Sequence, residues 1–512
     1  MIRPLRHLAR LVAIARVLAR HDALFLLERV AALKPLVLAM KAMARVQETG
    51  RPGERLARAL FELGPSFIKF GQALSTRSDL LGDEIAADLS ALQDRLDPFP
   101  SAEARATIEA ELGQAIAVSF RAFDDKPVAA ASIAQVHFAV TPEGDEVAVK
   151  VLRPGIEEAF ARDLDLMLWL AEIVEATQPG LRRLKPVETV RTLEASVRLE
   201  MDLRFEAAAA EEMADNFAGD PGLRIPKVDW TRTAQRVLTL ERVSGIPIDE
   251  RARIVEAGLD PKAVVEKAAV AFFNQVFRDG FFHADMHPGN LFVDAQGHLV
   301  LLDFGITGRI DRPTRLYLGE MLLGFLTGDY RRVAEIHFEA GYVPEDQSVD
   351  LFSQACRSIA EPILGRPLAE ISIARLLGQL FQITETFSME VQPQLLMLQK
   401  SMLVTEGVGR LLCPDVNMWG LAQPLIEDWI KHNLGPQAKL KDSLGGLAET
   451  ALKIPQLLSQ GERVAKMLSS RGLKLHPDTV KALTPGQGKR RFCHACLAWG
   501  LVFLLVAILL LK

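Results

Sequence analysis

Residues 281–305 read FFHADMHPGNLFVDAQGHLVLLDFG, and the rest of the chain is organised around this stretch. Asp285 is followed five residues later by Asn290, and Asp303 opens an Asp-Phe-Gly triplet. These are the D-x-x-x-x-N and D-F-G patterns of a phosphoryl-transfer site. In such a site one carboxylate orients the attacking oxygen and takes its proton. A second carboxylate and an amide oxygen hold Mg²⁺ against the nucleotide phosphates, because hard cations prefer oxygen ligands.

The residues between the two patterns predict a β-hairpin. Two short apolar runs, 291–293 and 299–302, are separated by DAQGH, whose glycine suits a tight turn. The hairpin would bring Asn290 and Asp303 together at its open end. We therefore predict Asp285 as the catalytic base, and Asn290 with Asp303 as the Mg²⁺ ligands. For either pattern alone, a plain hairpin with incidental surface carboxylates is the alternative.

The composition describes a large, mostly helical protein. The 512 residues are 49% hydrophobic, which allows a sizeable core and two or three domains. Aromatic residues make up only 6%, while Ala and Leu are abundant and favour helices. A net charge of −5 gives no general attraction to nucleic acid, so we expect no nucleic-acid partner. Four cysteines form no disulfide framework in so long a chain, which indicates a reducing compartment.

The segment from Phe120 to Leu152 predicts a small β-sheet. It runs as a strand, a small-residue loop, a strand, the turn TPEGDE and a last strand, VAVK, that carries Lys150. This is the layout of a kinase amino-terminal lobe, in which the lysine binds the nucleotide phosphates. Where ordinary kinases place glycines, the loop has alanines and a serine, so Cβ atoms restrict its conformations. We predict nucleotide contacts from Lys150 and from the loop residues Val128, Ala129, Ala130, Ala131, Ser132, Ile133, Ala134, Gln135 and Val136.

A lysine in this position usually needs a carboxylate to hold it. The sequence LEASVRLEMDLRFEAAAAEEMADNF, residues 193–217, predicts one long helix that carries Glu200, Asp202 and Glu206. Helical spacing places Glu206 near the face of Asp202 and well round from Glu200. We therefore predict Glu206 as the partner of Lys150, with Glu200 and Asp202 facing another element. A charged, exposed helix is the alternative.

Two further segments bear on the site. Residues 237–248 predict a strand followed by a connector between two lobes, in which residues 241–243 would offer backbone groups to an adenine base. After Gly305 the chain has no A-P-E element and no long activation segment, so the groove for a protein substrate is not visible. The chain from about residue 260 to 483 reads as predominantly helical. Protein kinase activity is therefore disfavoured.

The first twenty residues, MIRPLRHLARLVAIARVLAR, predict a basic amphipathic helix that starts near Pro4. Five arginines alternate with aliphatic residues, and no acidic residue occurs before Asp22. Such a helix can lie on an anionic membrane surface. A transit peptide and a helix packed on the body of the protein are the alternatives.

The carboxyl-terminal residues 492–511 form a stretch of 20 residues without formal charge. At about 1.5 Å per residue this stretch would span a bilayer core of roughly 30 Å. Residues 489–491 are Lys-Arg-Arg, which predicts that the body stays on the cytoplasmic side. A hydrophobic dimerisation helix is the alternative. Cys493 and Cys496 have C-x-x-C spacing without a second ligand pair, and we expect ordinary thiols there.

Together these motifs resemble the UbiB family of atypical kinase-like proteins, from about Leu60 to about Pro414. The resemblance implies an α+β, bilobal protein-kinase-like fold with a helical N-terminal extension and, here, a C-terminal transmembrane helix. It also implies ATP and Mg²⁺ as cofactors, and a role in ubiquinone biosynthesis at a membrane. The motifs that carry it are Lys69-Phe70-Gly71-Gln72, the Ala-rich loop, Val147 to Lys150, Glu200-Met201-Asp202, Asp285 to Asn290, Asp303 to Gly305, and KSMLVTEGVGRLL from Lys400.

The same resemblance gives a meaning to Lys69 and Gln72. Gly64-Pro65 predicts the start of a helix on which Lys69 and Gln72 share a face, and read alone this face is simply solvated. In the family this helix lies over the active site as a lid. The resemblance therefore implies that Lys69 and Gln72 contact Glu200 and Asp202.

The expected organisation has four segments: an extension over 1–115, an N-lobe over 116–248, a mostly helical C-lobe over 249–488, and the membrane span over 492–511. The leading interpretation is an ATPase or small-molecule kinase anchored in the bacterial inner membrane. A nucleotide-gated scaffold and a conventional protein kinase are the other two. Expected partners are membrane lipids, quinone precursors and quinone-biosynthesis enzymes, and the residues do not identify the acceptor.

Overall fold

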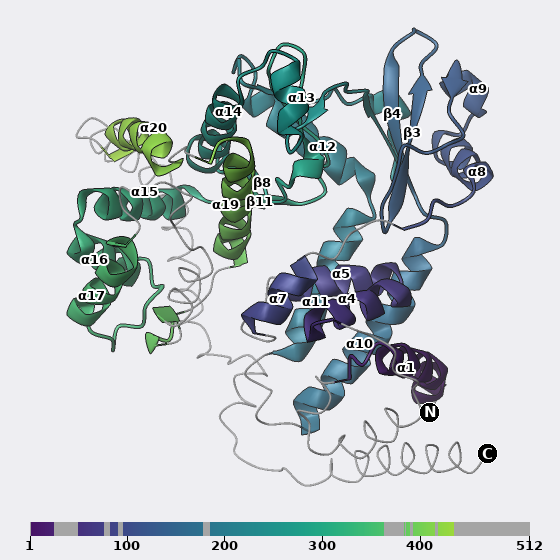
Figure 1. Ribbon diagram of the computed structural model, residues 1–512. Helices are drawn as coiled ribbons and strands as arrows, with labels where there is room; N and C mark the ends of the chain where they lie inside the picture. The colour runs from purple at the N-terminus through teal and green to yellow at the C-terminus, as the bar shows by residue number, and fades with distance from the viewer. Residues whose placement is uncertain are drawn as a thin grey trace, which may run out of the picture. The chain divides into compact units, whose positions relative to one another are not determined.

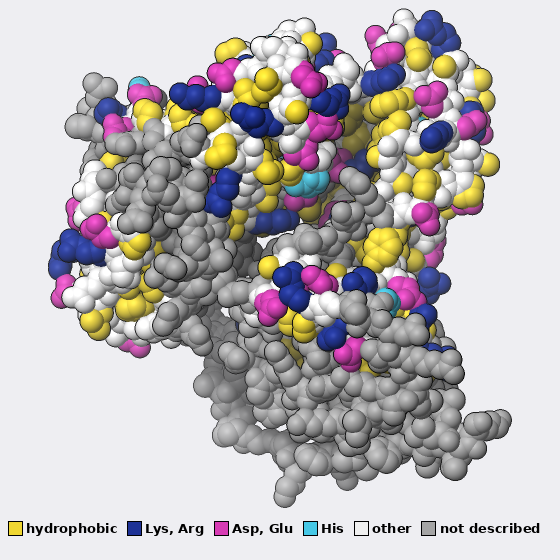
Figure 2. Space-filling view, viewed as in Figure 1, with side chains coloured by type: hydrophobic (Ala, Val, Ile, Leu, Met, Phe, Trp, Pro, Cys, Tyr) yellow, Lys and Arg dark blue, Asp and Glu magenta, His cyan; other side chains and the backbone are white. Residues whose placement is uncertain are grey.

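The chain divides into two compact units, residues 1–172 with 183–431 and residues 173–182 with 432–512. The first unit holds every strand in the described part of the chain (Figure 1). Acidic and basic side chains are interspersed over the face shown in Figure 2, in line with the nearly balanced composition. The computed structural model describes residues 2–24, 50–75, 82–90, 96–177, 185–362, 383–384, 386–389, 393–414 and 418–434.

An antiparallel sheet forms the N-lobe and directs Lys150 to one side. Its strands follow the order β1-β3-β4-β6, and β2 pairs with β3. In β4 the alternating residues Val147, Val149 and Val151 are buried against α8 (Ser101–Leu112), so Lys150 lies on the opposite face. The strands are β1 (Ala122–Phe123), β2 (Ala129–Ala130), β3 (Ala134–Val140), β4 (Glu146–Leu152) and β6 (Val237–Glu241), and α9 (Ile116–Ser119) follows α8.

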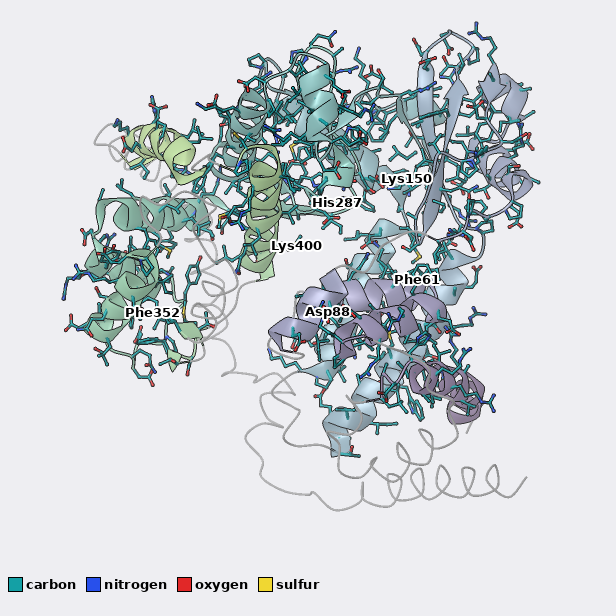
Figure 3. The ribbon with its side chains drawn as sticks, in the orientation of Figure 1. Phe61, Asp88, Lys150, His287, Phe352 and Lys400 are labelled. Atoms are coloured by element: carbon teal, nitrogen blue, oxygen red, sulfur yellow. The ribbon has the colours of Figure 1, made fainter. Side chains whose placement is uncertain are left out.

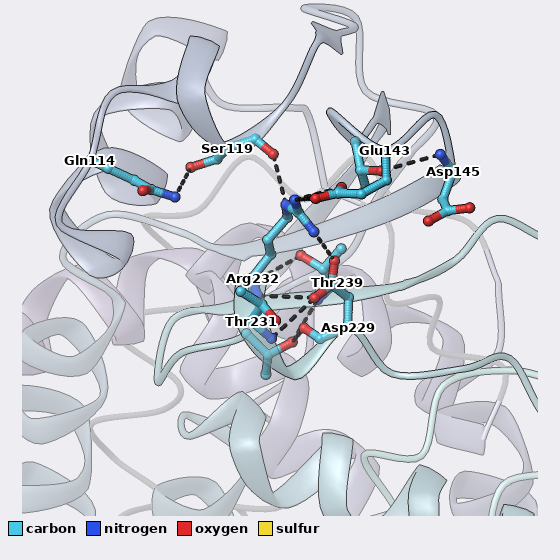
Figure 4. A network of polar contacts seen from close by, with 10 residues as sticks. Gln114, Ser119, Glu143, Asp145, Asp229, Thr231, Arg232 and Thr239 are labelled. Carbon is cyan, nitrogen blue, oxygen red and sulfur yellow. Dashed lines mark hydrogen bonds and ion pairs between the residues drawn. The ribbon is translucent and has the colours of Figure 1, made fainter.

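An arginine joins three segments at one end of this sheet (Figure 4). Arg232, in the short helix η3 (Trp230–Arg232), donates from Nε to the Ser119 carbonyl oxygen across 2.7 Å. Its other nitrogens reach Asp229 Oδ2 at 2.6 Å and Glu143 Oε2 at 2.8 Å. Because charge-assisted bonds of this kind are strong, they fix α9 and the β3–β4 turn against the start of β6. These contacts stabilise the sheet that carries Lys150.

Helices of the extension pack on the other side of the N-lobe. Gly64, with φ +103°, ends α4, and Pro65 starts α5 at once, so a sharp turn separates the two helices. Leu60 and Ile68 are buried in one apolar cluster with residues of the long helices α10 and α11. The helices of the extension are α1 (Ile2–Arg20), α4 (Pro52–Leu63), α5 (Pro65–Ser75) and α7 (Asp83–Ser90). The long helices that follow β4 are α10 (Ile156–Thr177), α11 (Pro186–Glu200) and α12 (Leu203–Asn216).

The single helix predicted over 193–217 is wrong, because the chain breaks between α11 and α12. Helix α11 ends at Glu200, and Asp202 caps α12 by accepting from the Arg204 backbone N–H across 3.2 Å. Asp is a preferred N-cap because its carboxylate satisfies an N–H that has no partner within the helix. The Arg204 guanidinium holds the same carboxylate at 2.7 and 2.9 Å. Glu200 and Glu206 therefore belong to different helices.

Helix α1 packs on the body of the protein, which was one of the alternatives for the amino terminus. It begins at Ile2 rather than Pro4. Arg10 binds both carboxylate oxygens of Asp163 on α10, at 2.8 and 2.9 Å, and donates to the Leu63 carbonyl at 3.2 Å. The His7 ring stacks on Trp169 with ring centroids 5.5 Å apart. Arg10 and His7 of this helix thus make contacts within the protein.

The hairpin predicted around the D-F-G pattern is confirmed. Strands β9 (Leu291–Val293) and β10 (Leu299–Leu301) pair antiparallel, with Leu301 opposite Leu291. At the open end, the Leu302 N–H donates to the Asn290 carbonyl across 2.9 Å, which brings Asn290 next to Asp303. The other C-lobe strands are β5 (Leu223–Arg224), β7 (Ile246–Pro247), β8 (Phe281–His283) and β11 (Thr307–Arg309).

The described part of the C-lobe is otherwise mostly helical, as predicted. Its core joins buried residues of α14 and the strands, including Phe272, Phe282 and Leu301. No helix among the described residues is long and apolar enough to cross a membrane, and the predicted span lies outside those residues. The helices are α13 (Arg251–Glu256), α14 (Pro261–Phe273), the π-helical turn η4 (Asn274–Asp279), α15 (Arg312–Thr327), α16 (Tyr330–Glu339), α17 (Val349–Ala360), α19 (Pro393–Leu412) and α20 (Met418–Leu434).

Candidate active site

Lys150 forms the centre of a charge cluster. Its Nζ lies 2.8 and 2.9 Å from the two carboxylate oxygens of Glu206, and 3.2 Å from Asp303 Oδ1. The predicted pairing of Lys150 with Glu206 is confirmed. Glu206 can reach the lysine because it lies in the first turn of α12, directly after the break. One cation is thus shared by two carboxylates.

The three charges shift one another's protonation. Burial raises the pKa of Glu206 to about 7; the Lys150 ammonium opposes this rise and the Asp303 carboxylate adds to it. Burial would lower the pKa of Lys150, but Asp303 and Glu206 together raise it above its usual value. Removal from water acts to raise the pKa of Asp303, yet Lys150 holds it below its usual range, and the charge of Lys69 helps. Asp303 is therefore ionised at neutral pH and available to a cation.

The backbone turns Asp303 outward while its neighbour is anchored. Asp303 has φ +56°, a left-handed conformation that is uncommon outside glycine, and half of its side chain is exposed. The Phe304 ring is buried and meets the His283 ring edge-on, with centroids 5.6 Å apart. A Cβ atom on Gly305 would lie 3.2 Å from Asp303 Oδ1. Phe304 thus anchors the turn, and a side chain at position 305 would press on the Asp303 carboxylate.

His283, a residue that the motif reading passed over, joins the two halves of the site. Its Nε2 lies 2.7 Å from the Asp303 carbonyl oxygen, and its Nδ1 accepts from the Asp285 N–H across 3.1 Å. These partners require a neutral ring with the proton on Nε2. Burial lowers the pKa of His283 and favours that state. Its position two residues before Asp285 could have identified it as a site residue, because protein kinases have a histidine at that position.

The Asp285 carboxylate has a cationic partner from a distant helix. Lys400, labelled on α19 in Figure 3, places Nζ 3.0 Å from Asp285 Oδ1. On the other side His287 Nε2 lies 3.8 Å from Oδ2. The Asn290 amide donates to the Asp285 backbone oxygen across 3.1 Å. No local pattern links Lys400 to Asp285, since 115 residues separate them.

Asn290 and Asp303 fit the role of Mg²⁺ ligands. The nitrogen of the Asn290 amide is engaged by the Asp285 carbonyl, which leaves the amide oxygen for a cation. Asp303 offers an ionised, half-exposed carboxylate. Within the described parts of the chain, no cluster of three or more His, Cys, Asp or Glu side chains could hold a metal ion by itself. This donor set suits Mg²⁺, which commonly binds one or two protein oxygens and takes its other ligands from phosphates and water.

The Ala-rich segment is not a single loop. It contains β2, a turn and the start of β3, and the Ala131 N–H donates to the Ala134 carbonyl across 2.7 Å. Arg153 clamps the turn by donating to the Ala131 carbonyl at 3.0 and 3.2 Å. The buried Gln135 side chain binds the backbone N–H and C=O of Phe99 at 2.9 and 3.2 Å. Gln135 thus holds a neighbouring segment, while nucleotide contact by the rest of this stretch stays a prediction.

Of the two carboxylates predicted to contact the lid helix, Glu200 makes the contact. Lys69 Nζ lies 2.8 Å from Glu200 Oε2, and their side chains are only 11% and 14% exposed. Gln72 follows on α5 and is half-buried. Asp202 was expected to face this helix as well, but its carboxylate caps α12 and binds Arg204. Since the charge of Lys69 also lowers the pKa of Asp303, the lid lysine lies within electrostatic range of the site.

The connector between the lobes has one backbone donor to spare. The Glu241 N–H donates to the Lys227 carbonyl across 2.8 Å, and the Arg242 N–H donates to the Glu146 carbonyl across 3.0 Å. Of the three residues predicted to face an adenine, Val243 keeps the N–H that is not engaged in these two bonds. Of residues 241–243, we therefore predict that Val243 donates its backbone N–H to the adenine base.

Comparison with known proteins agrees with this geometry. Residues 91–337 match the ABC1 atypical kinase-like domain, and residues 356–417 match the UbiB helical domain. A protein named "Probable protein kinase UbiB" from Marinobacter nauticus is 46% identical over 413 residues, which cover 79% of this chain and 76% of the relative. The chain belongs to the UbiB family. The UbiB relative from Xanthomonas euvesicatoria pv. vesicatoria is 40% identical over 481 residues, or 91% of this chain and 85% of that protein.

A solved structure supports the kinase-like α+β fold of this UbiB-family chain. The complex of Rv3197 with erythromycin from Mycobacterium tuberculosis is similar with a TM-score of 0.51 and 25% sequence identity. The similarity covers 72% of this chain and 93% of that one. The family resemblance inferred from the motifs is thereby confirmed, and with it an atypical kinase-like protein whose relatives are named for a kinase.

Proposed function

We propose that the protein binds Mg²⁺-ATP and transfers its terminal phosphoryl group to water or to a small or lipid-like acceptor in ubiquinone biosynthesis. The observation that carries this proposal is the meeting of Lys150, Glu206 and Asp303 beside Asp285 and Asn290. His283 ties Asp285 to Asp303 through their backbones. A scaffold that only senses nucleotide has no need of a base held next to the metal ligands.

The chemistry follows from the position of each group. Lys150 would hold the nucleotide phosphates, and Asp303 with Asn290 would hold Mg²⁺, which neutralises the charge that develops on the phosphate oxygens. Asp285 takes the proton of the acceptor O–H. The acceptor oxygen forms its bond to the γ-phosphorus as the bond from that phosphorus to the β,γ-bridging oxygen breaks, and ADP leaves with the electron pair.

Two observations favour a small acceptor over a protein. Helix α15 begins at Arg312, seven residues after Gly305, and β11 occupies part of that interval, so little chain remains for an activation segment. The contact between Lys69 and Glu200 also fastens α5 to α11 near the site. A bulky acceptor would have to displace that helix.

ATP consumption is the experiment that tests the proposed function. The full-length protein in membranes is supplied with Mg²⁺-ATP labelled at the γ-phosphate, and candidate lipids and quinone precursors are added singly. Release of phosphate, or transfer of label to one addition, supports the proposal. Binding of ATP without any turnover under all additions would favour the nucleotide-gated scaffold instead, and label on added proteins would favour a protein kinase.

The lid gives a separate prediction. Changing Lys69 to Ala leaves the mostly buried Glu200 carboxylate without its counter-charge and removes a positive charge near Asp303. We expect the dissociation constant for Mg²⁺-ATP to rise about tenfold, within the usual range of coupling between two sites. Titration calorimetry measures it. Lys185→Ala removes an exposed lysine that pairs with Glu188 and is the matched control; equal affinities for both variants would refute the lid.

Anchoring of the protein is proposed from the sequence. A chain that ends after Gly488 lacks the uncharged stretch 492–511 and should leave the membrane pellet on washing with high salt, because the charges that remain are screened. The full chain should stay in the pellet even after alkaline washing. Retention of the shortened chain under both washes would show that the principal anchor lies elsewhere.

A further inference from the structure

Lys400 reaches Asp285 from α19, a helix that no local sequence pattern connects with Asp285. Its Nζ lies 3.0 Å from Asp285 Oδ1, with 41% of the lysine side chain and 25% of the aspartate side chain exposed. Lys400 lies on α19, within the residues that match the UbiB helical domain. The pair is thus open to a ligand that approaches Asp285.

Helix α19 is packed against the C-lobe core and the residues next to Asp285. Val408 and Leu412 are buried in the C-lobe core. Arg251 donates from Nε to the Leu412 carbonyl across 2.9 Å, and Thr405 Oγ1 lies 4.0 Å from Met286 Sδ. Lys400 is therefore presented to Asp285 by a packed element.

The other polar groups around Asp285 lie farther from its carboxylate or face another atom. His287 Nδ1 accepts from the Gly289 N–H across 3.0 Å, and its Nε2 lies 3.8 Å from Asp285 Oδ2, beyond hydrogen-bond distance. The Asn290 amide is directed to the Asp285 backbone oxygen. Among the described residues, Lys400 is the lysine that forms an ion pair with the Asp285 carboxylate.

We infer that Lys400 is a further catalytic residue, which holds the Asp285 carboxylate and at the same time contacts the phosphoryl group during transfer. The inference rests on the proposed function. A base and a transferring phosphate are both negative, and each must come close to the acceptor oxygen, so their repulsion opposes the reaction. An ammonium has three N–H donors, of which Asp285 uses one. Lys400 takes no proton and forms no covalent bond.

The test compares the binding of Mg²⁺-ADP with and without aluminium fluoride, which mimics the phosphoryl group in transfer. Transition-state analogues bind more tightly than ground-state ligands, so the parent should bind ADP more tightly with fluoride present. Lys400→Met should bind Mg²⁺-ADP alone as tightly as the parent does. The increase in ADP affinity that aluminium fluoride causes should be about 100-fold smaller than in the parent, and kcat should be about 100-fold lower, as when one hydrogen-bond donor to a developing charge is removed. Lys400→Arg keeps the charge and should restore most of both.

Lys262→Met is the matched control, because Lys262 is an exposed C-lobe lysine that pairs with Glu266. It should retain the whole gain. If aluminium fluoride increased the ADP affinity of Lys400→Met as much as that of the parent, the inference would be overturned. Higher turnover in Lys400→Met would also overturn it, because Lys400 would then be an inhibitor of Asp285. Equal loss of ADP binding, of the gain and of thermal stability would show a structural role only. A parent that shows no gain with fluoride would instead contradict the proposed function, and the inference with it.

Discussion

Changing Asp303 to Asn should abolish the thermal stabilisation that Mg²⁺-ATP gives the protein. A ligand that binds only the folded state stabilises it by RT ln(1 + [L]/Kd), or about 2.7 kcal/mol at 100 times Kd. The ionised Asp303 carboxylate is the only charged oxygen ligand in the predicted Mg²⁺ set, and an amide of the same shape lacks its charge. The variant should therefore melt at nearly the same temperature with and without Mg²⁺-ATP.

The melting temperature is measured for each variant with Mg²⁺-ATP, with ATP and a chelator, and without ligand. Asp303→Asn also loses an ion pair with Lys150, so only the ligand-dependent difference is informative. Asp311→Asn is the control, because Asp311 caps α15 by accepting from the Thr314 N–H. That variant should be less stable and keep the full ligand shift. An undiminished shift in Asp303→Asn would remove Asp303 from the metal ligands.

Changing Asp285 to Asn should lower kcat by about 10³-fold, within the usual range for loss of a general base. The amide cannot take the proton of the acceptor. Its oxygen can still accept from Lys400, so the position of α19 should be preserved. The dissociation constant for Mg²⁺-ATP should stay within about threefold of the parent, because Asp285 is assigned to the acceptor rather than to the nucleotide.

Turnover and ATP affinity are therefore measured on the same preparation of Asp285→Asn. Asp294→Asn is a suitable control, since Asp294 binds the Gln296 and His298 N–H groups in the hairpin turn, away from the base. It should lose stability and keep its turnover per folded molecule. Parental kcat in Asp285→Asn would exclude it as the base, and loss of ATP binding would assign Asp285 to the nucleotide.

Much of the site was predictable because short patterns determine local geometry. The two apolar runs around the DAQGH turn form the hairpin that brings Asn290 to Asp303. The VAVK strand alternates buried valines with Lys150, so the lysine must lie on the face opposite α8. Its partner Glu206 was chosen correctly from among three nearby carboxylates.

The rest depended on contacts that no local pattern encodes. The Ala- and Glu-rich residues around Met201 favour a continuous helix, and the break is decided by Asp202 acting as a cap with Arg204 beside it. Lys400 meets Asp285 only because α19 packs on the C-lobe core, which periodicity cannot specify. His283, in contrast, could have been predicted from the sequence, since kinases have a histidine two residues before the catalytic aspartate.

The break between α11 and α12 would make the proposed ATP site and the proposed lid reciprocal effectors of each other. Glu200, which binds the lid lysine, and Glu206, which binds Lys150, are carried by one short run of backbone. If the lid contact tightens ATP binding by some factor, bound ATP must favour the closed lid by the same factor, because the two equilibria form a thermodynamic cycle. An acceptor or membrane component that opens α5 would then promote release of nucleotide, and a high ATP concentration would resist its entry.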